Sequence, residues 1–263
     1  MNKTAPIGIF DSGIGGTSIW KEIHELLPME HTLYLADSKY APYGYKTQEE
    51  IIALSIKNTE FLLEQGAKII VVACNTATTN AISTLRARYS VPFIGIEPAI
   101  KPAALKSHSG HIGILATKGT LSSELFHKTS QELTSNITVT EVVGEGLVPL
   151  IETGRLDGPE MIQLLKKYIQ PMLDADVDYL VLGCSHYPYI IPQLRKVLPA
   201  HIKIIDSGEA VALQTKAILE KHDLLNDGKT PPSIQFFTNA EVETLQWLLR
   251  DFAETITVEK RDF

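Results

Sequence analysis

The most informative part of the sequence reads Lys68-Ile-Ile-Val-Val-Ala-Cys74-Asn-Thr76. Its apolar, mostly β-branched run is typical of a strand buried on both faces, and the stretch that follows has helical character as far as Arg86. A strand that leads directly into a helix is the repeating unit of a parallel α/β sheet. Cys74 therefore lies at the carboxyl end of a predicted strand, where parallel α/β proteins bind ligands.

A second segment, Asp178-Tyr-Leu-Val-Leu-Gly-Cys184-Ser-His186, follows the same plan. Each segment leads through a helical stretch to another strand that ends in an acidic residue, Glu97 in the first copy and Asp206 in the second. Upstream, residues 7–10 (Ile-Gly-Ile-Phe) are echoed by residues 112–115 (Ile-Gly-Ile-Leu). The echo predicts two similar α/β halves, with one thiol on each side of a ligand bound between them.

Further apolar runs predict the remaining strands, and helical stretches separate most of them. Thr47 and Glu50 form a capping box that opens a helix, which Gly66 closes, and Thr238 with Glu241 predicts the start of another. The predicted strands span residues 7–10, 32–36, 68–73, 92–96, 112–116, 178–182, 202–205 and 233–237.

The composition indicates an ordinary globular protein: 44% of the 263 residues are hydrophobic and 21% are charged. The net charge of −7 and the lack of a Lys/Arg run argue against a nucleic-acid partner.

Asp11 interrupts the first apolar run too early for a signal peptide or a membrane span, so we expect a cytoplasmic, reducing location. The two cysteines are too far apart in sequence for a metal clip, and we expect no metal.

Each cysteine is either an inert residue of the core or a residue that takes part in a reaction. We expect Asn75 or Thr76 to cap the helix after Cys74, which would place that thiol where the helix dipole favours a thiolate. Cys184 precedes His186 by two residues, and an imidazole at that spacing can assist proton transfer.

The first predicted strand runs into a glycine-rich loop, Phe10-Asp-Ser-Gly-Ile-Gly-Gly16. The loop does not match the dinucleotide-binding pattern GxGxxG, because Ser18 replaces the third glycine. In addition, Asp11 would repel a phosphate. The loop suits an amino acid instead, with its ammonium group at Asp11 and its carboxylate at backbone N–H groups and Ser12. The alternative for Asp11 is a turn or cap residue.

Other polar residues have structural interpretations beside the functional ones. Tyr43 in the turn 41–44 suits packing, and Glu152 suits a solvated helix end. Thr117 and Thr120 occupy the loop that corresponds to the glycine-rich loop in the second half, where they suit helix capping.

Six short strings occur along most of the chain: Gly8-Ile-Phe-Asp-Ser-Gly13 with Gly15-Gly16, Pro42-Tyr-Gly44, Ala73-Cys-Asn-Thr-Ala77, Gly95-Ile-Glu-Pro98, Thr117-Lys-Gly-Thr120 and Gly183-Cys-Ser-His-Tyr-Pro188. In this order they resemble the glutamate racemase family of the aspartate/glutamate racemase superfamily. One departure is Ser185, where the family usually has threonine; the hydroxyl is kept and a methyl is lost, so we expect altered packing with the role intact.

The resemblance implies two similar parallel-sheet α/β domains related by pseudo-two-fold symmetry, with the active site in the cleft between them. The first would comprise residues 1–98 and 208–263, and the second residues 99–207. It implies interconversion of L- and D-glutamate without a cofactor, supplying D-glutamate for peptidoglycan, and it is compatible with a homodimer.

By the same resemblance, Cys74 and Cys184 are the acid/base pair, the first acting on D-glutamate and the second on L-glutamate. Supporting roles fall on Asp11, Glu152 and His186. Expected substrate contacts are Asp11, Ser12, Tyr43, Gly44, Asn75, Thr76, Thr120, Ser185 and His186.

A pair of acid/base residues also agrees with the chemistry of racemisation, because no single side chain reaches both faces of an α-carbon. One thiol must be ionised while the other is protonated, and we expect the helix N-termini and polar neighbours to increase the thiolate fraction. Alternatives remain: an aspartate or hydantoin racemase, a non-catalytic two-domain amino-acid binding protein, or a thiol hydrolase that uses Cys184 with His186. A pyridoxal-dependent racemase would need a Schiff-base lysine, which no motif nominates.

Overall fold

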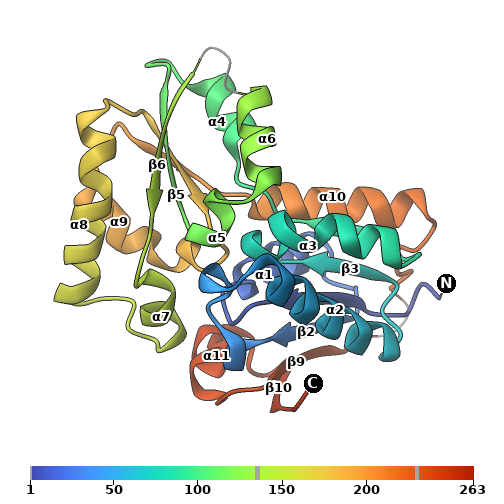
Figure 1. The fold of residues 1–263 in the computed structure, drawn as a ribbon. Coiled ribbons are helices and arrows are strands. Elements are labelled where there is room, and N and C mark those ends of the chain that lie inside the picture. Colours follow the sequence, from blue (N-terminus) through green and yellow to red (C-terminus); the bar gives the residue numbers. More distant parts are fainter. Residues whose placement is uncertain (1, 134–136, 229–230) are drawn as a thin grey trace.

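The computed structural model describes residues 2–133, 137–228 and 231–263, which form two separate β-sheets (Figure 1). Every strand pairing is parallel. The strands of sheet A are β1 (Ile7–Asp11), β2 (Thr32–Ala36), β3 (Ile69–Val72), β4 (Phe93–Gly95), β9 (Ile234–Thr238) and β10 (Thr257–Lys260). Those of sheet B are β5 (His111–Ala116), β6 (Thr138–Val143), β7 (Tyr179–Gly183) and β8 (Lys203–Ile205).

The two sheets share a strand order, as the internal echo predicts. Sheet B runs β6-β5-β7-β8, and sheet A contains the matching series β2-β1-β3-β4, with β9 and β10 added beyond β2. The echoed pairs β1/β5 and β3/β7 therefore occupy equivalent places. The predicted class of two similar parallel α/β units is confirmed.

Helices cover both faces of each sheet, so the central strands are buried on both sides. Alternate residues of β1 show this: Ile7 and Ile9 pack toward α1 and α10, whereas Phe10 packs toward α2 and α3. In sheet B, α7, α8 and α9 cover one face and α4, α5 and α6 cover the other. The helices are α1 (Thr17–Leu26), α2 (Gln48–Glu64), α3 (Asn75–Arg88), α4 (Ile100–Lys106), α5 (Lys118–Leu121), α6 (Glu124–Leu133), α7 (Leu147–Glu152), α8 (Pro159–Asp174), α9 (Ile191–Val197), α10 (Gly208–Lys221) and α11 (Glu243–Leu248).

All eight predicted strands are present within one residue at each end. The sequence analysis missed β6 and β10, which are edge strands with mostly exposed or half-buried side chains and no continuous apolar run. The capping box at Thr47 and Glu50 is confirmed, with both of its hydrogen bonds formed. The helix start predicted at Thr238 is wrong: Thr238 ends β9, its hydroxyl accepts the Ala240 N–H, and α11 begins at Glu243.

After β8 the chain returns to sheet A through α10, which packs against α1. The strands on either side fit a boundary near residues 207–208, but the exact domain limits stay a prediction. Among the described residues, no helix combines the length and apolarity needed to cross a membrane.

Gly8 and Gly113 occupy equivalent positions in β1 and β5 and offer a matched test of packing. A methyl group at Gly8 would lie 2.9 Å from Ala67 Cβ and 3.2 Å from Leu62 Cβ, whereas at Gly113 it would meet the flexible Met172 side chain. We expect Gly8→Ala to lower the free energy of unfolding by about 1–3 kcal/mol, because backbone-attached atoms cannot move aside. Gly113→Ala should cost less, since Met172 can adopt another rotamer. Equal losses in denaturant titrations would contradict this account of the packing.

Candidate functional site

Cys74 follows β3 after one residue, Ala73, and is itself the N-cap of α3. Its Sγ accepts the N–H of Ala77 at 3.4 Å and donates to Ser12 Oγ at 3.6 Å. The prediction that Asn75 or Thr76 caps this helix is therefore wrong, because both lie within its first turn. Cys74, one of the two candidate acid/base residues, is therefore also the residue that caps α3.

The electrostatic environment of Cys74 favours the neutral thiol. Burial raises the pKa of Cys74 far above its usual value, and the negative charge of Asp11 raises it further, against the hydrogen bonds with Ala77 and Ser12. The expectation that the helix N-terminus makes this thiol more acidic is wrong, because burial is the largest influence on its pKa and raises it.

Asp11 lies at the end of β1 and is completely buried. Its Oδ2 accepts the N–H groups of Gly13 and Gly16 at 3.3 and 3.0 Å, and its Oδ1 accepts the Ser185 hydroxyl at 3.1 Å. Burial raises the pKa of Asp11, while His186 and these hydrogen bonds act in the opposite direction. The Ser185 hydroxyl therefore links the second half to the first.

Cys184 follows β7 as Cys74 follows β3. Its Sγ lies 3.7 Å from Nδ1 of His186, whose Nε2 lies 2.5 Å from Oε1 of Glu152. Burial alone would lower the pKa of His186, but its contacts with Cys184 and Glu152 outweigh burial and hold that pKa well above the ordinary value. A cationic imidazole at this place would stabilise negative charge on the sulfur.

Glu152 reaches across to the first half from the end of α7. Its Oε1 also accepts the N–H of Ile14 at 2.7 Å, and its Oε2 accepts the Ser38 hydroxyl at 3.0 Å. Only 14% of its side chain is exposed. The alternative of a solvated helix end is therefore wrong for this residue.

The glycine-rich loop makes this close approach possible. A Cβ at Gly13 would lie 1.9 Å from Glu152 Oε1, and one at Gly15 would lie 2.2 Å from His186 Nδ1. These glycines leave room for side chains of the opposite half, which gives the loop a role other than phosphate binding.

A second contact between the halves lies near the N-terminus of α3. Thr76 Oγ1 is 2.8 Å from Thr117 Oγ1 and 3.2 Å from Thr120 Oγ1, and Thr117 caps α5 as predicted. A Cβ at Gly119 would lie 2.9 Å from the Thr76 methyl group and 3.1 Å from Gly44 Cα. A hydrogen bond fixes the side chain of Tyr43, because its hydroxyl donates to the buried carboxylate of Asp37.

Both thiols line one cavity between the halves. The structure brings seven of the predicted contact residues to its wall, whereas Asp11, Thr120 and Glu152 lie behind it. Thr117 lines it although the sequence suggested only a capping role, and Pro42 and Val148 were missed because small apolar residues carry no chemical signature. The lining residues are Ser12, Pro42, Tyr43, Gly44, Cys74, Asn75, Thr76, Thr117, Val148, Cys184, Ser185 and His186.

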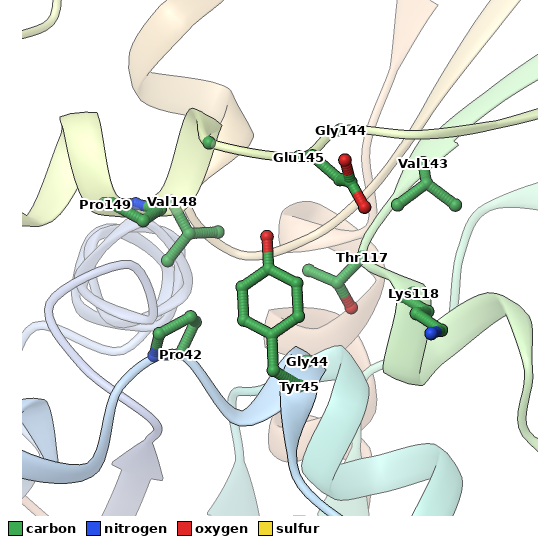
Figure 2. A pocket seen from close by; sticks show the side chains of 11 residues that line it. Pro42, Gly44, Tyr45, Thr117, Lys118, Val143, Gly144, Glu145, Val148 and Pro149 are labelled. Atoms are coloured by element: carbon green, nitrogen blue, oxygen red, sulfur yellow. The ribbon is translucent and has the colours of Figure 1, made fainter.

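A second cavity adjoins the first, and the two share Pro42, Gly44, Thr117 and Val148 in their walls. Figure 2 shows the Tyr45 side chain standing in this outer cavity between Val148 and Thr117. Tyr45 is 60% exposed, so it forms part of the outer surface next to the inner cavity. The described residues contain no cluster of three or more His, Cys, Asp or Glu side chains placed to hold a metal ion.

The charge of Asp11 gives a prediction for the ionisation of Cys74. Asp11→Asn removes a negative charge that raises the pKa of Cys74, so the alkaline midpoint of Cys74 ionisation should move to lower pH. The pH dependence of iodoacetamide alkylation, followed by mass spectrometry of the Cys74 peptide in a Cys184→Ser background, measures that midpoint. A midpoint that stays in place, or moves to higher pH, would show that Asp11 does not control this thiol.

Comparison with known proteins assigns the chain to a family. Residues 7–215 match the family described as Asp/Glu/Hydantoin racemase. The glutamate racemase of Pseudomonas syringae pv. tomato is 48% identical over 85% of this chain and 82% of its own length. The crystal structure of a glutamate racemase isoform from Bacillus anthracis superposes with a TM-score of 0.89 at 32% identity, covering 100% of this chain and 99% of that one. A Francisella tularensis glutamate racemase in complex with D-glutamate gives a TM-score of 0.85 at 28% identity, covering 99% and 98%. The chain therefore belongs to the Asp/Glu/hydantoin racemase family and groups with the glutamate racemases within it.

Proposed function

We propose that this protein interconverts L- and D-glutamate by proton transfer between two thiols, and that it supplies D-glutamate for peptidoglycan in the cytoplasm. One observation carries the proposal: two buried cysteines, each just beyond the end of an equivalent strand of a repeated unit, line one cavity from opposite halves. The relatives named glutamate racemase, and the D-glutamate bound by the Francisella tularensis protein, support glutamate as the substrate. A homodimer remains a prediction from the sequence.

The two thiols have different surroundings. Burial and the charge of Asp11 raise the pKa of Cys74, which favours its protonated form, and Cys184 lies 3.7 Å from the imidazole of His186, whose raised pKa favours a positive charge. In the proposed reaction Cys184 acts as a thiolate and removes the α-proton of L-glutamate, which leaves a carbanion. Cys74 then delivers its proton to the opposite face of the carbanion, the new C–H bond forms there, and D-glutamate leaves.

The polar groups around the thiols suit an amino acid. Ser12, Asn75 and Thr76 offer hydroxyl, amide and backbone N–H donors for carboxylates. Asp11 already accepts hydrogen bonds from Gly13, Gly16 and Ser185, so its charge supports the substrate ammonium through the Ser185 hydroxyl, whose oxygen remains an acceptor.

Deuterium wash-in tests the activity and the substrate together. In D₂O, both enantiomers of glutamate should acquire deuterium at the α-carbon as the antipode forms. Aspartate lacks one methylene and should exchange at least about tenfold more slowly, because a methylene in a fitted pocket contributes about 1–3 kcal/mol. Faster exchange with aspartate would favour an aspartate racemase. Absence of exchange with every amino acid tested would favour a non-catalytic binding protein.

Removal of either thiol tests the mechanism. Cys74→Ala and Cys184→Ala should each lower the rate of glutamate racemisation by at least about 10²-fold, the contribution expected of one positioned acid/base group. Circular dichroism and the thermal midpoint establish that each variant is folded. Racemisation near the wild-type rate in either folded variant would refute the two-thiol mechanism.

A further inference from the structure

Ser38 lies outside the wall of the cavity that holds the thiols, and no sequence motif nominated it. We infer that Ser38 is a positioning residue: together with the Ile14 N–H, its hydroxyl holds Glu152 across the cleft and thereby sets His186 against Cys184. The inference rests on the proposed function and adds a residue from the first half to the machinery of the thiol in the second half.

The fold places Ser38 at the cleft. It begins a 3-10 turn, Ser38–Tyr40, directly after Asp37 at the carboxyl end of β2, on the same edge of sheet A as Cys74. Asp37 fixes the turn, because its buried carboxylate accepts hydrogen bonds from Lys57 at 3.0 Å and from Asn58 at 3.2 Å. The Ser38 hydroxyl is therefore presented from a rigid base.

The two Glu152 oxygens are held differently. Oε1 accepts the Ile14 N–H and faces His186 Nε2, while the described hydrogen bond to Oε2 comes from Ser38. Ile14 and Ser38 belong to the first half, where they follow β1 and β2, whereas His186 belongs to the second half. Glu152 thus has its anchors on one side of the cleft and its partner on the other.

Loss of the Ser38 hydroxyl would free one end of the carboxylate. Glu152 ends a six-residue helix and is followed two positions later by Gly154, so its backbone alone does not fix the side chain. A carboxylate anchored through one oxygen can rotate about its terminal torsion, which is broad and soft. The 2.5 Å contact with His186 would lengthen on average, and His186 would be oriented less well toward Cys184.

The effect should reach one thiol only. The contacts of Cys74 are with Ser12 and Ala77, and neither residue touches Ser38 or Glu152 in the described hydrogen bonds. Enantiomers have equal free energies, so kcat/KM must fall by the same factor in both directions whichever thiol is impaired. The primary isotope effect of the α-hydrogen separates the two thiols, because each enantiomer loses that hydrogen to a different one.

The test compares Ser38→Ala with Ser38→Thr, which keeps the hydroxyl. Ser107→Ala is a matched control, since Ser107 also donates to a carboxylate, Asp178, at 2.7 Å, but at the opposite end of β7 from Cys184. For each protein, kcat/KM is measured in H₂O with α-protiated and α-deuterated glutamate of both enantiomers. The thermal midpoint of each variant is recorded alongside.

Ser38→Ala should lower kcat/KM about tenfold, as expected for a hydrogen bond to a charged group. The isotope effect with deuterated L-glutamate should rise relative to that with deuterated D-glutamate, because proton transfer at Cys184 becomes more rate-limiting. Ser38→Thr should restore both quantities, and Ser107→Ala should change neither.

Three results would overturn the inference: unchanged kcat/KM in Ser38→Ala, a lower kcat/KM with an unchanged ratio of the two isotope effects, or a ratio that moves toward D-glutamate. The second would mark Ser38 as merely structural. Failure of the proposed function is distinguishable, because the wild-type protein would then show neither racemisation nor an isotope effect with either enantiomer.

Discussion

The close approach of the two halves at the cleft is the constraint on which the site depends. Side chains of the second half enter the first so deeply that Gly13 and Gly15 have no room for a Cβ, and Gly119 meets the backbone of Gly44 on the other side of the cavity. This contact bounds the cavity that the two cysteines line. A loop that resembles a nucleotide-binding turn in sequence serves here as a docking surface for Glu152 and His186.

The repeated topology places equivalent residues in unequal surroundings. Cys74 and Cys184 follow equivalent strands, but Cys74 lies near the buried charge of Asp11, whereas Cys184 lies beside an imidazole paired with a carboxylate. Cys74 is therefore surrounded by groups that disfavour a thiolate, whereas Cys184 has an imidazole beside it. This difference suits the proposed reaction, in which one thiol accepts a proton and the other donates one.

Much of this arrangement could be predicted from the sequence, because the buried strands and the two cysteine segments carry strong local signals. The edge strands β6 and β10 could not, since their exposed faces break the apolar runs. The helix cap at Cys74 and the raised pKa of its thiol depend on burial, which sequence spacing does not report. Only folding brings distant segments together and so places Ser38, Thr117 and Val148 at the site. The net charge of −7 also takes on a different meaning, because an anionic substrate must be held by local donors against the field of the whole chain.

The location of deuterium in the first turnovers tests most directly whether two opposed thiols carry out the proton transfer at the α-carbon. L-glutamate is incubated with the enzyme in D₂O, the reaction is stopped at low conversion, and the α-deuterium content of substrate and product is measured separately by mass spectrometry. Two thiols on opposite faces predict deuterium in the D-glutamate formed, while the remaining L-glutamate keeps its α-hydrogen, and the mirror result from D-glutamate. Deuterium entering the remaining substrate as fast as the product would indicate a single base serving both faces and would contradict the account.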